Sequence, residues 1–112
     1  MSEPAKTRNV IKEIEAERRR QISEEGYDDD HDDKHYEGQL ARAAYCYTRH
    51  AATDTLHKFA LQMVTEGSCP PMWPWHVRHW KPKDRRSDLI KAAALIAAEV
   101  ERLDRLEAKN AE

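Results

Sequence analysis

A regular apolar repeat near the C-terminal end constrains the fold of this chain more than any other feature. Apolar residues follow one another at spacings of 4, 3, 4 and 3 between residues 89 and 103: Leu89, Ala93, Ile96, Val100 and Leu103. This spacing is typical of an amphipathic helix that packs along one face. Because Asp84 can act as an N-cap, the sequence predicts a long last helix that begins there.

A first helix is expected over residues 7–25, and Gly26 follows it as a natural C-terminal stop. Its apolar residues form one narrow stripe that consists of Val10, Ile11, Ile14 and Ile22. So thin a stripe does not stabilise a helix alone in water. We therefore expect it to lie against other helices or against a partner chain.

The middle of the chain completes the expected architecture. A second helix is predicted from Tyr36, with Leu40, Ala43, Ala44 and Tyr47 on one face, and a restart at Thr53-Asp54 would extend the pattern to residue 63. Residues 68–83 hold four prolines and three tryptophans, so they predict an ordered but irregular loop. The tryptophans could stack on a nucleobase, but at least two of them are expected to fill the core.

Composition and charge exclude several classes of protein. Only three glycines and one phenylalanine disfavour an all-β fold. Nineteen Lys+Arg against 21 Asp+Glu disfavour a purely electrostatic nucleic-acid binder. The longest apolar runs fall short of the roughly 18 residues of a membrane span, and the N-terminus is unlike a signal peptide. We expect one all-α domain, a cytoplasmic bundle of three to four helices with frayed tails at residues 1–6 and 108–112.

Residues 24–37 form an acidic segment that contains eight carboxylates and only one lysine. Such crowding is unfavourable unless cations neutralise it. The mixed ligands His31, Asp32, Asp33 and His35 could hold a divalent ion such as Mg²⁺ or Mn²⁺. Alternatively, the segment is an acidic loop whose histidines cap helix ends or pair with the arginine run 18–20.

A basic cluster surrounds the expected start of the last helix. It consists of Lys81, Lys83, Arg85, Arg86 and Lys91. A helix N-terminus with flanking arginines and lysines is a good receiver of phosphate. Alternatively, these side chains neutralise the acidic segment within the bundle or across a dimer.

A polar seam runs along the first helix through Glu17, Arg18, Gln21 and Glu25, which lie at helical spacings. It indicates a ligand site or an inter-helix network. The two cysteines, Cys46 and Cys69, are expected to be free thiols. The sequence contains neither a Gly-rich phosphate-binding loop nor the order of Ser, His and Asp residues that is typical of serine hydrolases.

These segments resemble a family of small bacteriophage and prophage proteins. The resemblance rests on Glu17-Arg18-x-x-Gln21, on His31-Asp32-Asp33-x-His35 and on Trp80-Lys81-Pro82-x-Asp84-Arg85-Arg86-x-Asp88-Leu89, and it covers roughly residues 13–47 and 73–105. More remotely, the chain is similar to the MazG-like all-α nucleotide pyrophosphohydrolases, which use Mg²⁺ held by carboxylates from two helices. It departs from their Glu-Glu-x-x-Glu and Glu-x-x-Asp hallmarks.

The resemblance implies a nucleotide or nucleotide-like ligand and assigns roles to individual residues. The catalytic carboxylates would be Glu17, Glu25, Asp88 and Glu99. The residues expected to bind the ligand come from the polar seam, the tryptophan-rich loop and the basic cluster described above: Arg18, Gln21, Trp80, Lys81, Lys83, Arg85, Arg86 and Lys91. The chain would then be a divergent metal-dependent pyrophosphohydrolase, or a non-catalytic phage protein that sequesters a nucleotide signal or inhibits a host protein as counter-defence. A homo-oligomer is expected in either case, because both apolar stripes need partners.

Overall fold

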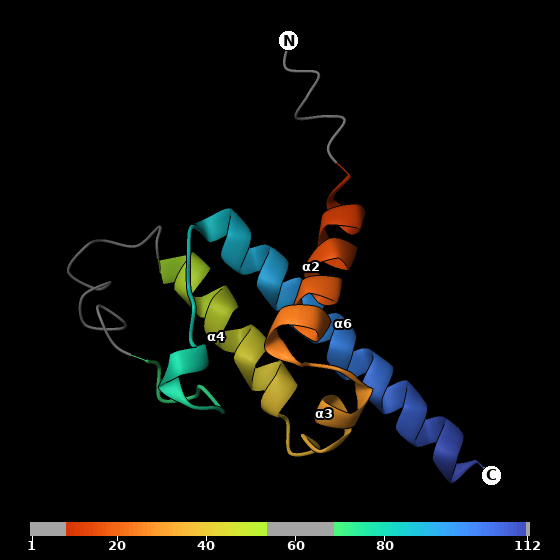
Figure 1. Ribbon diagram of the computed structural model, residues 1–112. Helices are drawn as coiled ribbons and strands as arrows, with labels where there is room; N and C mark the ends of the chain where they lie inside the picture. The colour runs from red at the N-terminus through yellow and green to blue at the C-terminus, as the bar shows by residue number, and fades with distance from the viewer. Residues whose placement is uncertain (1–8, 54–68, 112) are drawn as a thin grey trace.

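The computed structural model describes residues 9–53 and 69–111, which are helical apart from turns and loops (Figure 1). The elements in this part of the chain are α2 (Val10–Glu25), α3 (Asp29–Asp33), α4 (Gln39–Thr53), the 3-10 turn η1 (Val77–His79) and α6 (Arg85–Asn110). The prediction of a small all-α bundle is confirmed. The expected helical restart from Asp54 to residue 63 lies outside the described residues.

Side-chain caps and one glycine set the ends of the long helices. α2 begins three residues later than expected, because the Asn9 side chain accepts a hydrogen bond from the Lys12 backbone nitrogen. Gly26 ends α2 in the left-handed conformation, with φ 80°. Asp84 caps α6, as predicted, and accepts from the Ser87 backbone nitrogen. α6 continues to Asn110, so residues 108–110 are helical rather than part of a frayed tail.

The acidic segment is not irregular throughout, because residues 29–33 within it form the short helix α3. Asp28 caps this helix by accepting a hydrogen bond from the His31 backbone nitrogen. The aspartates of its first turn lie near the positive end of the helix dipole, which stabilises them. Dense negative charge is therefore compatible with helix at this position.

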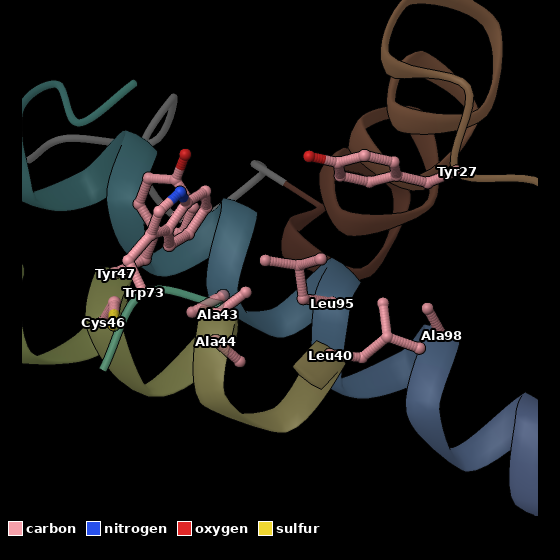
Figure 2. Close-up of a cluster of buried hydrophobic side chains, with 10 residues drawn as sticks. Tyr27, Leu40, Ala43, Ala44, Cys46, Tyr47, Trp73, Leu95 and Ala98 are labelled. Carbon is pink, nitrogen blue, oxygen red and sulfur yellow. The ribbon is translucent and has the colours of Figure 1, made fainter. Parts of the chain in front are cut away.

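α6 is the element on which α2, α3 and α4 all pack (Figure 1). The core lies mainly between α4 and α6, and the predicted face of α4 is buried there. Figure 2 shows Leu40 close to Leu95 and Ala98, with the Tyr27 ring reaching toward them from the segment after α2. Small alanines on both helices allow the two backbones to approach closely.

The two apolar stripes seen in the sequence are not the packing faces, which corrects the prediction for α2 and α6. The residues of α2 that become buried are Arg18 and Gln21, whereas Ile11 stays 73% exposed. α6 buries Leu95, Ala92, Ala94 and Ala98. The large residues of its predicted 4-3-4-3 repeat, called the heptad row below, are exposed: Leu89, Ile96, Val100 and Leu103. The packing faces of α2 and α6 therefore consist mainly of alanines and long polar side chains, together with Leu95.

The tryptophan-rich loop closes one end of the core. Trp73 is buried, and Trp75 and Trp80 are partly buried against the same cluster, in agreement with the prediction that at least two tryptophans fill the core. The Tyr47 hydroxyl accepts a hydrogen bond from the Lys81 backbone nitrogen at 3.2 Å. This contact holds the end of the loop at the start of α6, beside the cleft described next.

Candidate functional site

A polar cleft of about 610 Å³ lies between α2 and the first turns of α6. Four glutamates from α2 and five cationic residues from both sides contribute to its wall. The lining residues are Glu13, Ala16, Glu17, Arg20, Glu24, Glu25, Lys81, Lys83, Arg86, Ser87, Ile90 and Lys91. Six residues predicted from the sequence as catalytic or phosphate-binding thus lie in one place.

The α2 side of the cleft is a regular helical row. Glu13, Glu17, Arg20 and Glu24 follow at spacings of 4, 3 and 4, so they share one face. Of this row, only Glu17 was predicted from the sequence as a site residue. The spacing itself was the signal that could have revealed the other three residues.

Ion pairs across the cleft join α2 to the start of α6. The Arg86 guanidinium donates to both carboxylate oxygens of Glu13 at 2.8 and 2.7 Å. Lys81 Nζ lies 3.1 Å from Glu25 Oε2. Arg20 donates to both oxygens of Glu17 and also contacts Glu25. The Arg86–Glu13 and Lys81–Glu25 pairs therefore hold the two walls of the cleft together.

Two lysines of the cleft form no ion pair within the described part of the chain. Lys83 is exposed, whereas Lys91 is largely buried and donates from Nζ to the Lys81 carbonyl. Lys91 Nζ also lies 5.3 Å from the centre of the Tyr47 ring. Burial lowers the pKa of Lys91 from its ordinary value. Positive charge at these two positions is available to an anionic ligand.

Gln21 carries a buried acceptor without a partner beside this cleft. Its Nε2 donates to Glu17 Oε2 and to the Lys91 carbonyl, both at 3.3 Å. Those two partners can only accept, which fixes the orientation of the amide. Its Oε1 is buried and has no hydrogen-bond partner in the described structure. Such an atom is costly to leave unsatisfied, so a water or a ligand donor is expected there.

Asp88, predicted as catalytic, lies behind the cleft and positions its wall. Its carboxylate is fully buried and accepts from the Lys83 backbone nitrogen at 2.6 Å. His50 Nδ1 lies 2.6 Å from the other carboxylate oxygen. His50 was not predicted as a site residue, because 38 residues separate it from Asp88 along the chain.

The remaining predicted ligand residues lie outside the cleft. Arg18 is buried and donates to Asp32 Oδ2 and to the Tyr27 carbonyl, both at 2.9 Å. Arg85 donates to the Ala51 carbonyl. Glu99 pairs with Arg102, and Trp80 packs against the core. Arg18 therefore joins α2 to α3 and to the segment after α2, whereas the Glu99–Arg102 pair lies within α6.

The four residues predicted as metal ligands have other partners. Asp32 pairs with Arg18, and Asp33 pairs with Arg105 at 2.8 Å. His31 Nδ1 lies 2.8 Å from Asp32 Oδ1, and His35 Nδ1 lies 2.6 Å from the His31 carbonyl. Among the described residues, no three His, Cys, Asp or Glu side chains are arranged to hold a metal ion. Arg18 and Arg105 pair with aspartates of the acidic segment, whereas two residues of the basic cluster, Lys81 and Arg86, pair with glutamates of α2.

A second hollow of about 330 Å³ adjoins the cleft, and Glu25 lines both. Aromatic and imidazole rings form most of its wall, and Tyr27 stacks on His31 with 4.6 Å between ring centres. The Trp75 indole nitrogen is buried without a partner in the part of the chain described. The lining residues are Glu25, Tyr27, His31, His35, Trp75, His76 and His79.

Comparison of the chain with protein-family models, curated proteins and solved structures finds no match. None of the helices in residues 9–53 and 69–111 has the length and apolar character needed to cross a membrane. The fold and the cleft thus define the chain as a small all-α protein with a mixed-charge cleft.

Proposed function

We propose that this protein binds a nucleotide or nucleotide-like ligand, with the phosphates in the cleft between α2 and α6. The observation that carries this proposal is the pair Lys83 and Lys91, which line the cleft without a carboxylate partner in the described structure. Arg20, Lys81 and Arg86 line the same space. Together these groups offer charge-assisted hydrogen bonds, which are the strong contacts to phosphate oxygens.

Side chains, and not the N-terminus of α6, would hold the phosphate. Asp84 already accepts from the Ser87 backbone nitrogen, and Asp88 accepts from that of Lys83. These two amides are therefore engaged in the structure. Phosphate would compete with Glu13 and Glu25 for Arg86 and Lys81. Because salt screens the attraction between exposed cations and phosphate, binding is expected to weaken as salt concentration rises.

The ring-lined hollow beyond Glu25 would receive the base. Flat aromatic and imidazole faces suit stacking on a nucleobase. The buried Trp75 indole N–H is a donor without a partner in the described region, and a base offers acceptor atoms for it. A nucleotide would then bind more tightly than inorganic pyrophosphate, because only the nucleotide reaches both spaces.

Hydrolysis of the ligand is a second candidate function. It is favoured by Glu17, Glu24 and Glu25, which line the cleft beside the cations, as metal-binding carboxylates do in the MazG-like pyrophosphohydrolases. In the described arrangement, however, Arg20 contacts all three carboxylates. The residues present do not fit a Mg²⁺ or Mn²⁺ site, and we derive no catalytic step through a metal. Non-catalytic sequestration of a nucleotide signal, as in a phage counter-defence protein, needs no metal.

A thermal-shift screen of the full chain tests the proposal. Nucleoside triphosphates, cyclic nucleotides, NAD and inorganic pyrophosphate are added with Mg²⁺ or with a chelator. We expect a nucleotide to raise the melting temperature with the chelator present. A rise that requires Mg²⁺, together with pyrophosphate release, would favour hydrolysis. Absence of any shift would overturn the nucleotide proposal and leave a protein-binding role, for which a host protein is the expected partner.

Variants of the cleft test where the ligand binds. Lys83→Met and Lys91→Met each remove one charged contact, and we expect each to weaken binding about tenfold or more. Lys34→Met is the matched control, since Lys34 is an exposed lysine away from the cleft. Equal binding by the control and by both cleft variants would place the ligand elsewhere.

A further inference from the structure

α6 has two opposite faces that are both apolar. One face packs against α2 and α4 and buries Ala92, Leu95 and Ala98. The other face carries the heptad row predicted from the sequence, and it points away from the bundle. Its large members are half-exposed: Leu89 45%, Ile96 52%, Val100 51% and Leu103 47%.

Such a row is unusual on the outer face of a helix. Surface helices normally turn polar residues to water, and single exposed aliphatics are common, whereas contiguous rows mark interaction sites. Here the row also keeps the spacing of 4, 3, 4 and 3 that forms the seam of a coiled coil. A partner helix with the same repeat would fit it.

A second copy of α6 has the same repeat, and the charges at the two ends of the row determine whether the second helix runs parallel or antiparallel to the first. Arg85 lies four residues before Leu89 and Glu107 lies four residues after Leu103, so both continue the row at its ends. Both residues are exposed, and neither forms an ion pair with another described residue. The Arg85 Nε donates to the Ala51 carbonyl of α4, and this bond occupies only one of the five N–H donors of the guanidinium. Two antiparallel copies would place Arg85 of each beside Glu107 of the other. Two parallel copies would place like charges together.

The antiparallel arrangement also matches side-chain sizes. With Ile96 on the two-fold axis, Leu89 of one copy lies level with Leu103 of the other. Near the centre, Ala93 lies close to Val100 of the second copy, so a small residue faces a larger one. The two helix dipoles then oppose each other, which is favourable.

We propose that the outer face of α6 binds a second copy of this chain in an antiparallel, two-fold symmetric dimer centred on Ile96. This proposal does not depend on the ligand proposed above, because the cleft lies on the side of α6 that faces α2. The interface is isologous, so the same residues contribute from both copies.

Sedimentation equilibrium over a range of micromolar concentrations tests the dimer. The chain has a mass of 13.1 kDa, and we expect twice that mass at the upper concentrations. Ile96→Glu should give the monomer mass while its far-UV circular dichroism stays helical. Ile11→Glu is the matched control, because Ile11 is an exposed isoleucine on α2 outside the row. A wild-type chain that is monomeric throughout, or equal masses for the two variants, would overturn the proposal.

Charge reversal tests the direction of the helices. Arg85→Glu or Glu107→Arg alone replaces attraction with repulsion at both ends of the interface, and we expect the dimer Kd to rise roughly tenfold. The double variant restores opposite charges in the antiparallel arrangement and should recover the original Kd. A double variant that dimerises no better than the single variants would rule out this arrangement.

Discussion

Arg18, one of the residues predicted to bind the ligand, connects α2 to three other segments of the bundle through its side chain. It donates to the Tyr27 carbonyl after α2, to Asp32 in α3 and, at 3.4 Å, to Glu101 in α6. Arg18 and Asp32 are both buried. A buried pair contributes little compared with an apolar pair of the same size, but breaking it is costly.

We therefore expect Arg18→Met to lower the free energy of unfolding by about 3–5 kcal/mol, because the Asp32 carboxylate stays buried without its cation. Arg105→Met is the matched control. Arg105 also pairs with acidic residues of α3, but its partners Asp29 and Asp33 are both exposed, so the expected loss is about 0–1 kcal/mol. Urea denaturation measures both. Similar losses for the two variants would contradict a structural role for Arg18.

Glu25 should make stability depend on pH on the acid side. Burial raises its pKa, but hydrogen bonds from Lys81 and Arg20 and their charges outweigh burial and hold the pKa below its ordinary value of 4.5. A carboxylate whose pKa is lower in the folded state than in the unfolded state stabilises the fold at pH values above its unfolded-state pKa. This contribution is lost as the pH falls through its folded-state pKa.

Glu25→Gln is accordingly expected to be less stable than the wild type at neutral pH and to lose less stability on acidification below 4.5. Urea midpoints measured across that range test this expectation. Glu24→Gln is the control, since the Glu24 side chain is 66% exposed. Parallel pH profiles for wild type and Glu25→Gln would show that Glu25 does not contribute.

Individual site residues could be predicted from the sequence only where partners lie close along the chain. The seam residues Glu17 and Glu25 were found from their helical spacing, and four residues of the basic cluster were found from their closeness in sequence. The structure brings these six residues together in the cleft. The pairs His50–Asp88 and Arg86–Glu13 join residues far apart in sequence, so no local pattern reveals them. For Arg18, sequence alone does not distinguish a ligand residue from an internal ion pair, since both need a charged residue on an inward face.

At the scale of elements, Gly26 determines where α2 stops. Its φ of 80° is a left-handed conformation that residues with a Cβ adopt at a cost. A Cβ added there would meet no atom within 4 Å. The cost of a substitution is therefore conformational and not steric.

Gly26→Ala should destabilise the fold by about 1–2 kcal/mol, and Gly26→Asn should cost less, because asparagine tolerates the left-handed region. Thermal denaturation followed by circular dichroism compares the two variants. An asparagine variant as unstable as the alanine variant would indicate that the turn after α2, and not the dihedral angle, is affected.

Helix ends were easier to predict than helix faces. Gly26 and Asp84 end and begin helices through their own backbone or side chain, so the sequence carries that information locally. Which face of α6 turns inward depends on what packs against it. The heptad row and the alanine-rich face of α6 are both compatible with burial. In the structure the alanines of α4 pack on the alanine-rich face, so the heptad row is left exposed.

At the scale of the whole molecule, α6 makes the bundle one cooperative unit. α2, α3 and α4 each pack on it, so a defect at its centre removes support from all three. Leu95 lies there and is 1% exposed. Leu95→Ala leaves a cavity and should lower the free energy of unfolding by about 2–5 kcal/mol.

Because these helices share one support, unfolding of Leu95→Ala should remain a single transition. Far-UV circular dichroism reports on the helices, and tryptophan fluorescence reports on the loop packed against α4, so the two curves should coincide. Val77→Ala is the control, since Val77 is an exposed aliphatic residue outside α6, and its effect should stay within about 0.5 kcal/mol. Separate transitions in the two signals would mean that α2 or α4 holds its structure without α6, contrary to the way these helices pack.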